Sequence, residues 1–176
     1  MRRRDEGKRA RVCRAAIVLS VLAGQARFAG AEALPANARL LHPAERMAVG
    51  RAILGASHKL AGAECQGLLD EFADAEGRPL RAALEGQNLD AEAYLGRVLF
   101  YDTPPEACGG LALAGTHLVG SRVIRVCGRR FVRASTESSS HAEAVIIHEM
   151  LHALGLGENP PTSAHITSRV MDRCRR

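Results

Sequence analysis

One apolar stretch that contains three ionisable side chains constrains this chain more than any other feature. Residues 144–156 read AVIIHEMLHALGL, in which His148, Glu149 and His152 interrupt a run of apolar residues. The apolar residues predict a helix that is buried in a core, and Gly155 is typical of a helix C-terminus. Burying two imidazoles and a carboxylate is costly unless these groups bind something. We therefore expect a core helix that carries a binding site.

The spacing of these three side chains points to a metal. Residues four apart share a helix face, so His148 and His152 can direct two imidazoles at one ion, with Glu149 one step round the helix. H-E-x-x-H is the spacing of zinc peptidases, in which zinc activates a water molecule. In this chemistry a glutamate takes the proton of the water and passes it to the leaving amine. We therefore predict Zn²⁺ as the cofactor and Glu149 as the catalytic base.

Residues 148–158, HEMLHALGLGE, resemble the metzincin motif H-E-x-x-H-x-x-G-x-x-H at every position except the last. The family usually has His at that position, snapalysin-like members have Asp, and this chain has Glu158. The resemblance implies a small zincin-like metallopeptidase with a peptide or protein substrate. Metzincins also have a methionine turn beneath the metal. Met171 is the single methionine after the motif, but its helical spacing with Ile166 and Val170 predicts a core position.

The motif supplies two zinc ligands, whereas a catalytic zinc usually takes three from the protein. Glu158 is the predicted third ligand, because Gly155 permits a sharp turn out of the helix and a carboxylate oxygen is an ordinary zinc ligand. His165, expected in the first turn of a final helix, is the alternative third ligand. His117 and His141 are further donors, and an ordinary loop or strand position is the competing interpretation of each.

The net charge of +5 belongs to the N-terminal segment and not to the rest of the chain. Residues 1–31 contain eight Lys and Arg and two acidic residues, whereas residues 32–176 contain 16 basic and 17 acidic residues. The segment has a basic start, an apolar run at 15–24 and small residues at Ala29 and Ala31, which is the pattern of a cleaved signal peptide. We therefore predict a secreted or periplasmic protein with no nucleic-acid partner. Membrane attachment is expected only if the segment stays uncleaved.

The cysteines agree with export. Five are present, and removal of the signal peptide removes Cys13. The other four contain no C-x-x-C pair, and an even set in an exported domain favours two disulfides. We predict Cys108–Cys127, around a pair of strands, and Cys65–Cys174, between a terminal helix and the N-terminal helices. Four reduced, buried thiols are the alternative.

The remaining pattern predicts one α+β domain, residues 32–176, in which helices pack on a short antiparallel sheet. Helices are expected over 43–60, from 63 to a break at 74–79, over 90–102 with Asp90 as cap, over 139–155, and over 164–174 with Ser163 as cap. Alternating and β-branched residues predict strands at about 111–117 and 122–133, followed by a polar loop at 133–140.

The features together predict an exported zinc-dependent metallopeptidase that hydrolyses peptide bonds, with Glu149 as general base. The alternative is a non-catalytic exported metal-binding or interaction protein built on a degenerate zincin domain. The pattern carries no indication of oligomeric state.

Overall fold

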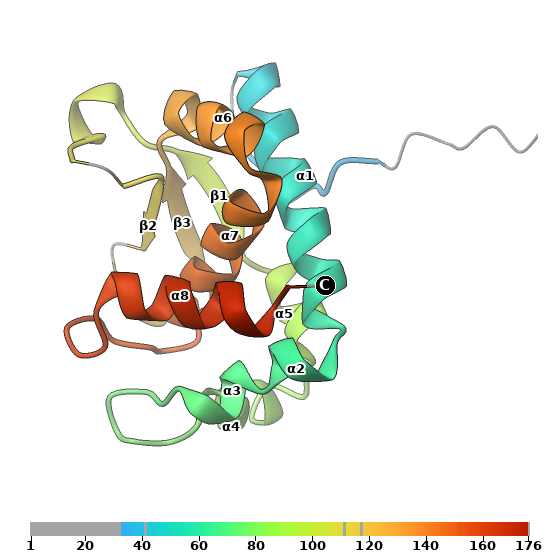
Figure 1. The fold of residues 1–176 in the computed structure, drawn as a ribbon, viewed down its shortest axis with the longest axis vertical. Helices are drawn as coiled ribbons and strands as arrows, with labels where there is room; N and C mark the ends of the chain where they lie inside the picture. Colours follow the sequence, from blue (N-terminus) through green and yellow to red (C-terminus); the bar gives the residue numbers. More distant parts are fainter. Residues whose placement is uncertain (1–32, 41, 111, 117, 176) are drawn as a thin grey trace, which may run out of the picture. The chain divides into compact units, whose positions relative to one another are not determined.

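The computed structural model describes residues 33–40, 42–110, 112–116 and 118–175. The predicted signal peptide and His117 lie outside the described residues. The described chain is an α+β domain in which helices pack against a small sheet (Figure 1). The predicted fold class is therefore confirmed.

The sheet contains β1 (Leu99–Asp102), β3 (Val123–Val126) and β2 (Ala114–Thr116), in that spatial order. β2 and β3 pair antiparallel, as predicted, with Thr116 opposite Ile124. β1 pairs parallel with β3. The sheet is therefore mixed and not purely antiparallel as predicted. The parallel strand is missing from the prediction, which places the residues of β1 in a helix. Among the described strands, β2 lies at an edge of the sheet.

The helix that carries the motif, α7 (Ser139–Ala153), lies at the centre of the packing. It contacts α1 (Pro43–Leu60), α6 (Gly128–Glu137), α8 (Ser163–Arg173) and the strands β2 and β3. Side chains from these elements and from β1 form one apolar core; its fully buried members include Val49, Phe100, Ile124, Phe131, Ile146, Ile147, Met150, Leu151, Ile166 and Val170. Packing on several sides makes α7 a fixed support for its polar side chains.

The short helices after α1 differ from the predicted single helix. The chain forms α2 (Ala63–Gln66) and α3 (Leu68–Glu71), with Gly67 between them. Glycine lowers helix propensity, which accounts for the division. The predicted inward residues are nevertheless buried, namely Cys65, Leu68, Leu69 and Phe72. A further helix, α4 (Leu80–Glu85), lies where we predicted none.

The helix predicted over 90–102 is helical only over Ala91–Leu95. α5 (Ala91–Leu95) begins with the predicted cap, in which the Asp90 carboxylate accepts from the Ala93 N–H at 2.7 Å. The chain leaves the helix at Gly96, and the following LFYD becomes β1. Aromatic residues favour strands, and a short apolar run does not distinguish a helix from a strand by its period.

The strand predicted over 122–133 ends at Val126, where the alternation of apolar residues ends. α6 follows, so the predicted polar loop at 133–140 is helical at its start and leads into α7. Phe131 is fully buried, and the hydroxyls of Ser135 and Thr136 donate to the carbonyl of residue 132 in the preceding turn. These bonds to the backbone satisfy the hydroxyl groups of a polar segment whose composition is typical of a loop.

Both predicted disulfides are present. Cys65–Cys174 joins α2 to the C-terminal end of α8, with Cα atoms 4.6 Å apart. Cys108–Cys127 joins the segment after β1, which includes the 3₁₀ helix η1 (Pro105–Ala107), to the residue after β3. The Cα atoms of this second pair are 5.7 Å apart.

The N-cap of α8 lies one residue before the predicted one. Thr162, and not Ser163, is the N-cap, and its hydroxyl accepts from the His165 N–H at 3.3 Å. None of the described helices, α8 included, is long and apolar enough to cross a membrane.

Candidate functional site

The ends of α7 fix the register of its polar residues. At its start the Ser138 hydroxyl accepts from the His141 N–H at 3.2 Å, which is an N-terminal cap. Beyond its end Gly155 has φ +119°, a conformation that other residues rarely adopt. The Leu156 N–H then donates back to the Leu151 carbonyl at 3.0 Å. The chain therefore reverses directly after the motif, and Leu156 lies beside the last turn of the helix.

The two motif imidazoles point toward each other. His148 Nε2 and His152 Nε2 are 3.0 Å apart, and both side chains are buried. His152 Nδ1 lies 2.7 Å from the Leu156 carbonyl oxygen. A carbonyl can only accept, so His152 carries its proton on Nδ1 and presents a lone pair at Nε2. His148 Nδ1 lies 2.9 Å from the Thr167 hydroxyl, which accepts when this ring has the same tautomer.

This arrangement fits two ligands of a zinc ion. Two nitrogens that bind one zinc at about 2.0–2.1 Å in tetrahedral geometry lie about 3.3 Å apart. The separation of the His148 and His152 Nε2 atoms is close to that value. Each ring also has a partner at its other nitrogen, which is how proteins orient metal-binding histidines. Two converging lone pairs repel each other unless a cation lies near both.

The third ligand is not in position. Among the residues that the structure describes, no three His, Cys, Asp or Glu side chains converge closely enough to hold a metal ion. Glu158 is exposed but lines the same cavity as His148 and His152. His165 is exposed and turns to Phe72, with ring centroids 6.3 Å apart, and it does not line this cavity. His141 lines a neighbouring cavity on the same face of α7.

Glu149 is held by the edge strand. It is 6% exposed, and the Thr116 hydroxyl of β2 donates to its carboxylate at 3.0 Å. Burial raises the pKa of the Glu149 carboxyl above its usual value, whereas the hydrogen bond from Thr116 and the nearby His152 oppose this shift. Burial, with a smaller effect of His152, lowers the pKa of His148 to about 4. Neutral imidazole is the form that binds a metal.

Two adjoining cavities meet at the motif. One of about 240 Å³ includes His152 and Glu158, and the other of about 180 Å³ includes His141 and Thr167. The residues that line both lie on α7, beside β2 and at the start of α8, namely Ala112, Ala114, His148, Glu149 and Ser163. Together the cavities form a cleft along the edge strand.

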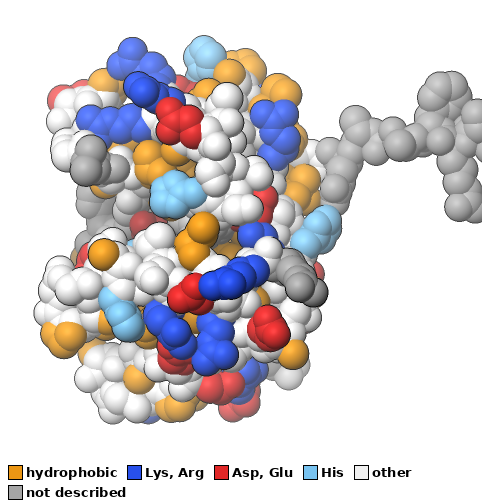
Figure 2. All heavy atoms as spheres, in the orientation of Figure 1, with side chains coloured by type: hydrophobic (Ala, Val, Ile, Leu, Met, Phe, Trp, Pro, Cys, Tyr) orange, Lys and Arg blue, Asp and Glu red, His pale blue; other side chains and the backbone are white. Residues whose placement is uncertain are grey.

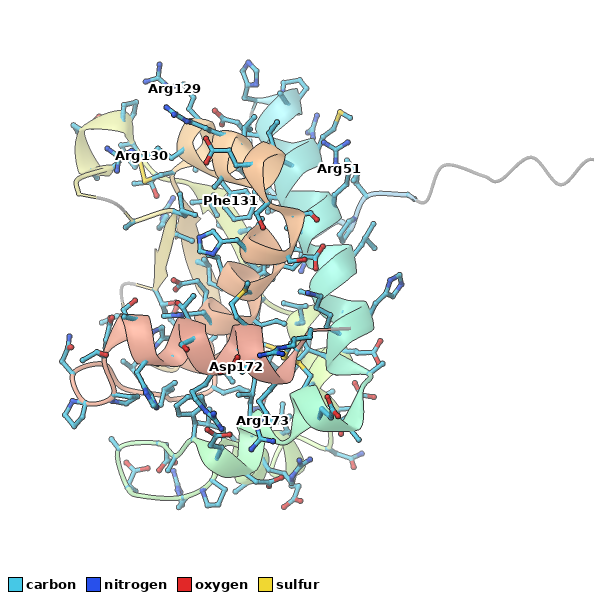
Figure 3. All side chains as sticks on the ribbon, viewed as in Figure 1. Arg51, Arg129, Arg130, Phe131, Asp172 and Arg173 are labelled. Atoms are coloured by element: carbon cyan, nitrogen blue, oxygen red, sulfur yellow. A yellow bond between two sulfur atoms is a disulfide. The ribbon has the colours of Figure 1, made fainter. Side chains whose placement is uncertain are left out.

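A larger cavity lies away from these two. It has about 470 Å³ and is lined by residues after β1 and at the start of α6, including Arg129 and Arg130 (Figure 3). None of the motif residues lines it. The chemistry that the motif offers is therefore confined to the smaller cleft.

Met171 is not a core residue as predicted. Its side chain is 38% exposed on α8, beside Lys59 and Asp172. The core face of α8 is formed by Ile166 and Val170, and Met171 follows them on the outer side. α8 brings Thr167, and not a methionine, to His148.

Two residues of this site could not be identified from the sequence. Thr116 and Thr167 bond to motif side chains that lie 33 and 19 residues away along the chain. Neither belongs to a recognisable spacing, so only their proximity in the fold identifies them.

Comparison with protein-family models, with curated proteins and with solved structures gave no match. The geometry of the cleft is therefore the basis for a function.

Proposed function

We propose that the protein is an exported zinc-dependent metallopeptidase. One observation carries this proposal: the Nε2 atoms of His148 and His152 lie 3.0 Å apart, while the buried carboxylate of Glu149 stands next to them on the helix. Both imidazoles have their outer nitrogens engaged, so their inner nitrogens are available for an ion. Three buried polar groups that face a cleft destabilise a core helix unless they bind something, so we interpret them as a hydrolytic site and not as packing residues.

Zinc bound here would lower the pKa of a water molecule and polarise the substrate carbonyl. His148 and His152 would hold the ion, and Glu158, an exposed residue that lines the same cavity, would supply the third ligand. Glu149 takes a proton from water and delivers it to the leaving amine. Its burial supports this role, because a raised pKa brings a carboxylate closer to the range in which it both accepts and returns a proton.

The edge strand supports a peptide substrate. β2 pairs with β3 on one side, and residues of β2 line the cleft on the other. An extended peptide can add to such a strand through main-chain hydrogen bonds. Ala112 and Ala114 have small side chains and Gly115 has none, which leaves room for the peptide beside Glu149. The proposed substrate is therefore an extended segment of a peptide or protein.

The disulfides support the proposed export. Disulfides persist in oxidising compartments and are rare in a reducing cytoplasm. Cys65–Cys174 and Cys108–Cys127 are both formed within the described chain. We propose that residues 1–31 direct the chain to the periplasm or the exterior and are removed there.

A non-catalytic metal-binding protein is the second candidate. It is favoured by one observation, namely that no third ligand converges with His148 and His152 in the described residues. A site with two protein ligands could bind an ion weakly without activating water.

Metal analysis and activity separate these candidates. The exported protein is expected to contain about one zinc per chain, and His152→Ala is expected to lose it. Glu149→Gln should retain zinc and lose the hydrolysis of a mixed peptide library. Glu137→Gln, an exposed change at the end of α6, is the matched control and should retain both. Hydrolysis by Glu149→Gln at the wild-type rate would contradict the mechanism, and a zinc-free wild type would contradict the proposed function.

A further inference from the structure

One polar side chain of α8 hydrogen-bonds to a histidine of the motif. The Thr167 hydroxyl lies 2.9 Å from His148 Nδ1 and lines the cavity that also includes His141. His152 has an equivalent partner, the Leu156 carbonyl, but that partner is backbone. Thr167 is therefore the single side chain, among the described residues, that hydrogen-bonds to a motif imidazole from outside α7.

The position of Thr167 is fixed by its helix. Ile166 and Val170 flank it and are fully buried against the core. On the far side of α8, Arg169 and Arg173 pair with Glu71 of α3. Basic and acidic side chains lie side by side over this region in Figure 2, and Arg173 extends from α8 toward α3 in Figure 3.

The end of α8 is fixed covalently. Cys174 is bonded to Cys65 of α2, so α8 is attached to the α2–α3 segment at its last turn. Core packing, ion pairs and a terminal disulfide thus all hold α8 in place. These attachments restrict the movement of α8 and keep Thr167 beside His148.

We propose that Thr167 is a positioning residue, which fixes the tautomer and the orientation of His148 for metal binding. This inference rests on the proposed function. When His148 Nδ1–H donates to the Thr167 hydroxyl, the lone pair is on Nε2, which faces His152 Nε2. Without this partner the ring can rotate or place its proton on Nε2, and either change removes the metal-binding lone pair. Loss of such an outer partner typically costs about 10–100-fold in metal affinity.

The zinc affinity of the full exported protein tests this inference, measured by competition with a chromophoric chelator. Thr167→Val keeps the volume of the side chain and removes the hydroxyl, and its zinc affinity is expected to fall about 10–100-fold. Thr167→Ser keeps the hydroxyl and should bind zinc nearly as tightly as wild type. Ser168→Ala, at the next and exposed position of α8, is the matched control and should not differ from wild type.

A second readout needs no metal. Nitrogen NMR of the metal-free protein reports which ring nitrogen of His148 carries the proton, and Thr167→Val is expected to change that signal while Thr167→Ser preserves it. Thr167→Ala serves as the second variant if Thr167→Val does not fold. Unchanged zinc affinity and an unchanged His148 signal in a folded hydroxyl-free variant would overturn the inference. A wild type that binds no zinc would instead overturn the proposed function, and the NMR comparison would still decide the role of Thr167.

Discussion

The Thr116 hydroxyl donates a hydrogen bond of 3.0 Å to the Glu149 carboxylate, which ties the edge strand to the motif helix. The bond holds the carboxylate at the wall of the cleft that β2 forms. The strand proposed to bind substrate therefore also positions the proposed catalytic base.

Thr116→Val should lower kcat and leave zinc affinity unchanged. The variant loses the hydrogen bond that orients Glu149, and a misplaced base lowers the rate by about tenfold or more. Zinc affinity should not change, because Thr116 does not contact either histidine ring by a hydrogen bond. Thr136→Val is the matched control, since its hydroxyl bonds only to the backbone of α6 in the described structure. Equal kcat values for Thr116→Val and wild type would contradict the positioning of Glu149 by β2.

The third ligand is tested by two substitutions. Glu158→Gln should weaken zinc binding by about 1.4 kcal/mol or more, which is tenfold or more in Kd, because an amide is a poorer ligand than a carboxylate. His165→Ala should leave zinc binding unchanged, since His165 packs against Phe72 outside the cleft. Isothermal titration with zinc measures both. The opposite ranking would identify His165 as the third ligand.

Removal of the Cys65–Cys174 disulfide should affect zinc binding as well as stability. The bond closes a loop of 109 residues, whereas Cys108–Cys127 closes 19. The chain-entropy relation gives about 4.7 kcal/mol for a loop of about 100 residues and about 3 kcal/mol for one of about 15. Both paired Cys→Ser variants should thus be less stable to denaturant.

Only one of these two variants should also bind zinc more weakly. Cys65→Ser with Cys174→Ser frees the end of α8, the helix that carries Thr167. Cys108→Ser with Cys127→Ser is the control, because both cysteines line the larger cavity, which no motif residue lines, and neither anchors α8. Equal zinc affinities in two folded variants would show that the disulfide does not support the site.

The ion pairs between α3 and α8 should make stability depend on pH. Hydrogen bonds from Arg169, and then Arg173, lower the pKa of the Glu71 carboxyl below its usual value of 4.5. A lowered pKa stabilises the folded state above the unfolded pKa, and this contribution disappears as the pH falls through the folded pKa. The free energy of unfolding should therefore decline below about pH 4.5.

Glu71→Gln isolates this contribution. Between pH 6 and pH 3 the wild type should lose more of its free energy of unfolding than the variant, by no more than about 1 kcal/mol, because the pairs are partly exposed. Urea titration at each pH provides the values. Identical pH dependences of the two proteins would mean that Glu71 contributes nothing.

Gly155→Ala should destabilise the protein and weaken zinc binding together. The residue has φ +119°, and an added Cβ would lie 3.3 Å from the Asp74 side chain. Such a conformation costs of order 1–3 kcal/mol for a residue with a side chain. A shift of the turn would also displace the Leu156 carbonyl from His152. Gly157→Ala is the control, because an added Cβ there meets no atom within 4 Å. If Gly155→Ala were as stable as Gly157→Ala, the turn would not need glycine.

The parts of the fold that follow from the sequence are those with local causes. The Pro43 start of α1, the Asp90 cap and the glycine end of α7 each depend on neighbouring residues, and all three predictions are confirmed. The prediction of a helix for LFYD is wrong because the strand at these residues depends on β3, a partner more than 20 residues away. Short apolar runs have no period that distinguishes the two states.

The candidate site also has a part that follows from local spacing and a part that depends on distant residues. The helical spacing of His148 and His152 predicts that their rings meet, and the rings do so. The groups that orient the rings and the base come from other elements and could not be inferred from spacing. Thr116 belongs to β2, and Thr167 depends on how α8 packs against α7.

Both groups that orient the histidines follow them in the chain. Leu156 and Thr167 are synthesised after His152, and Cys174, which anchors α8, is synthesised later still. A growing chain therefore carries a complete H-E-x-x-H sequence before it has the partners that direct the imidazoles. If the protein binds zinc as proposed, the site would therefore be completed late in biosynthesis, after Thr167 and Cys174 have been made.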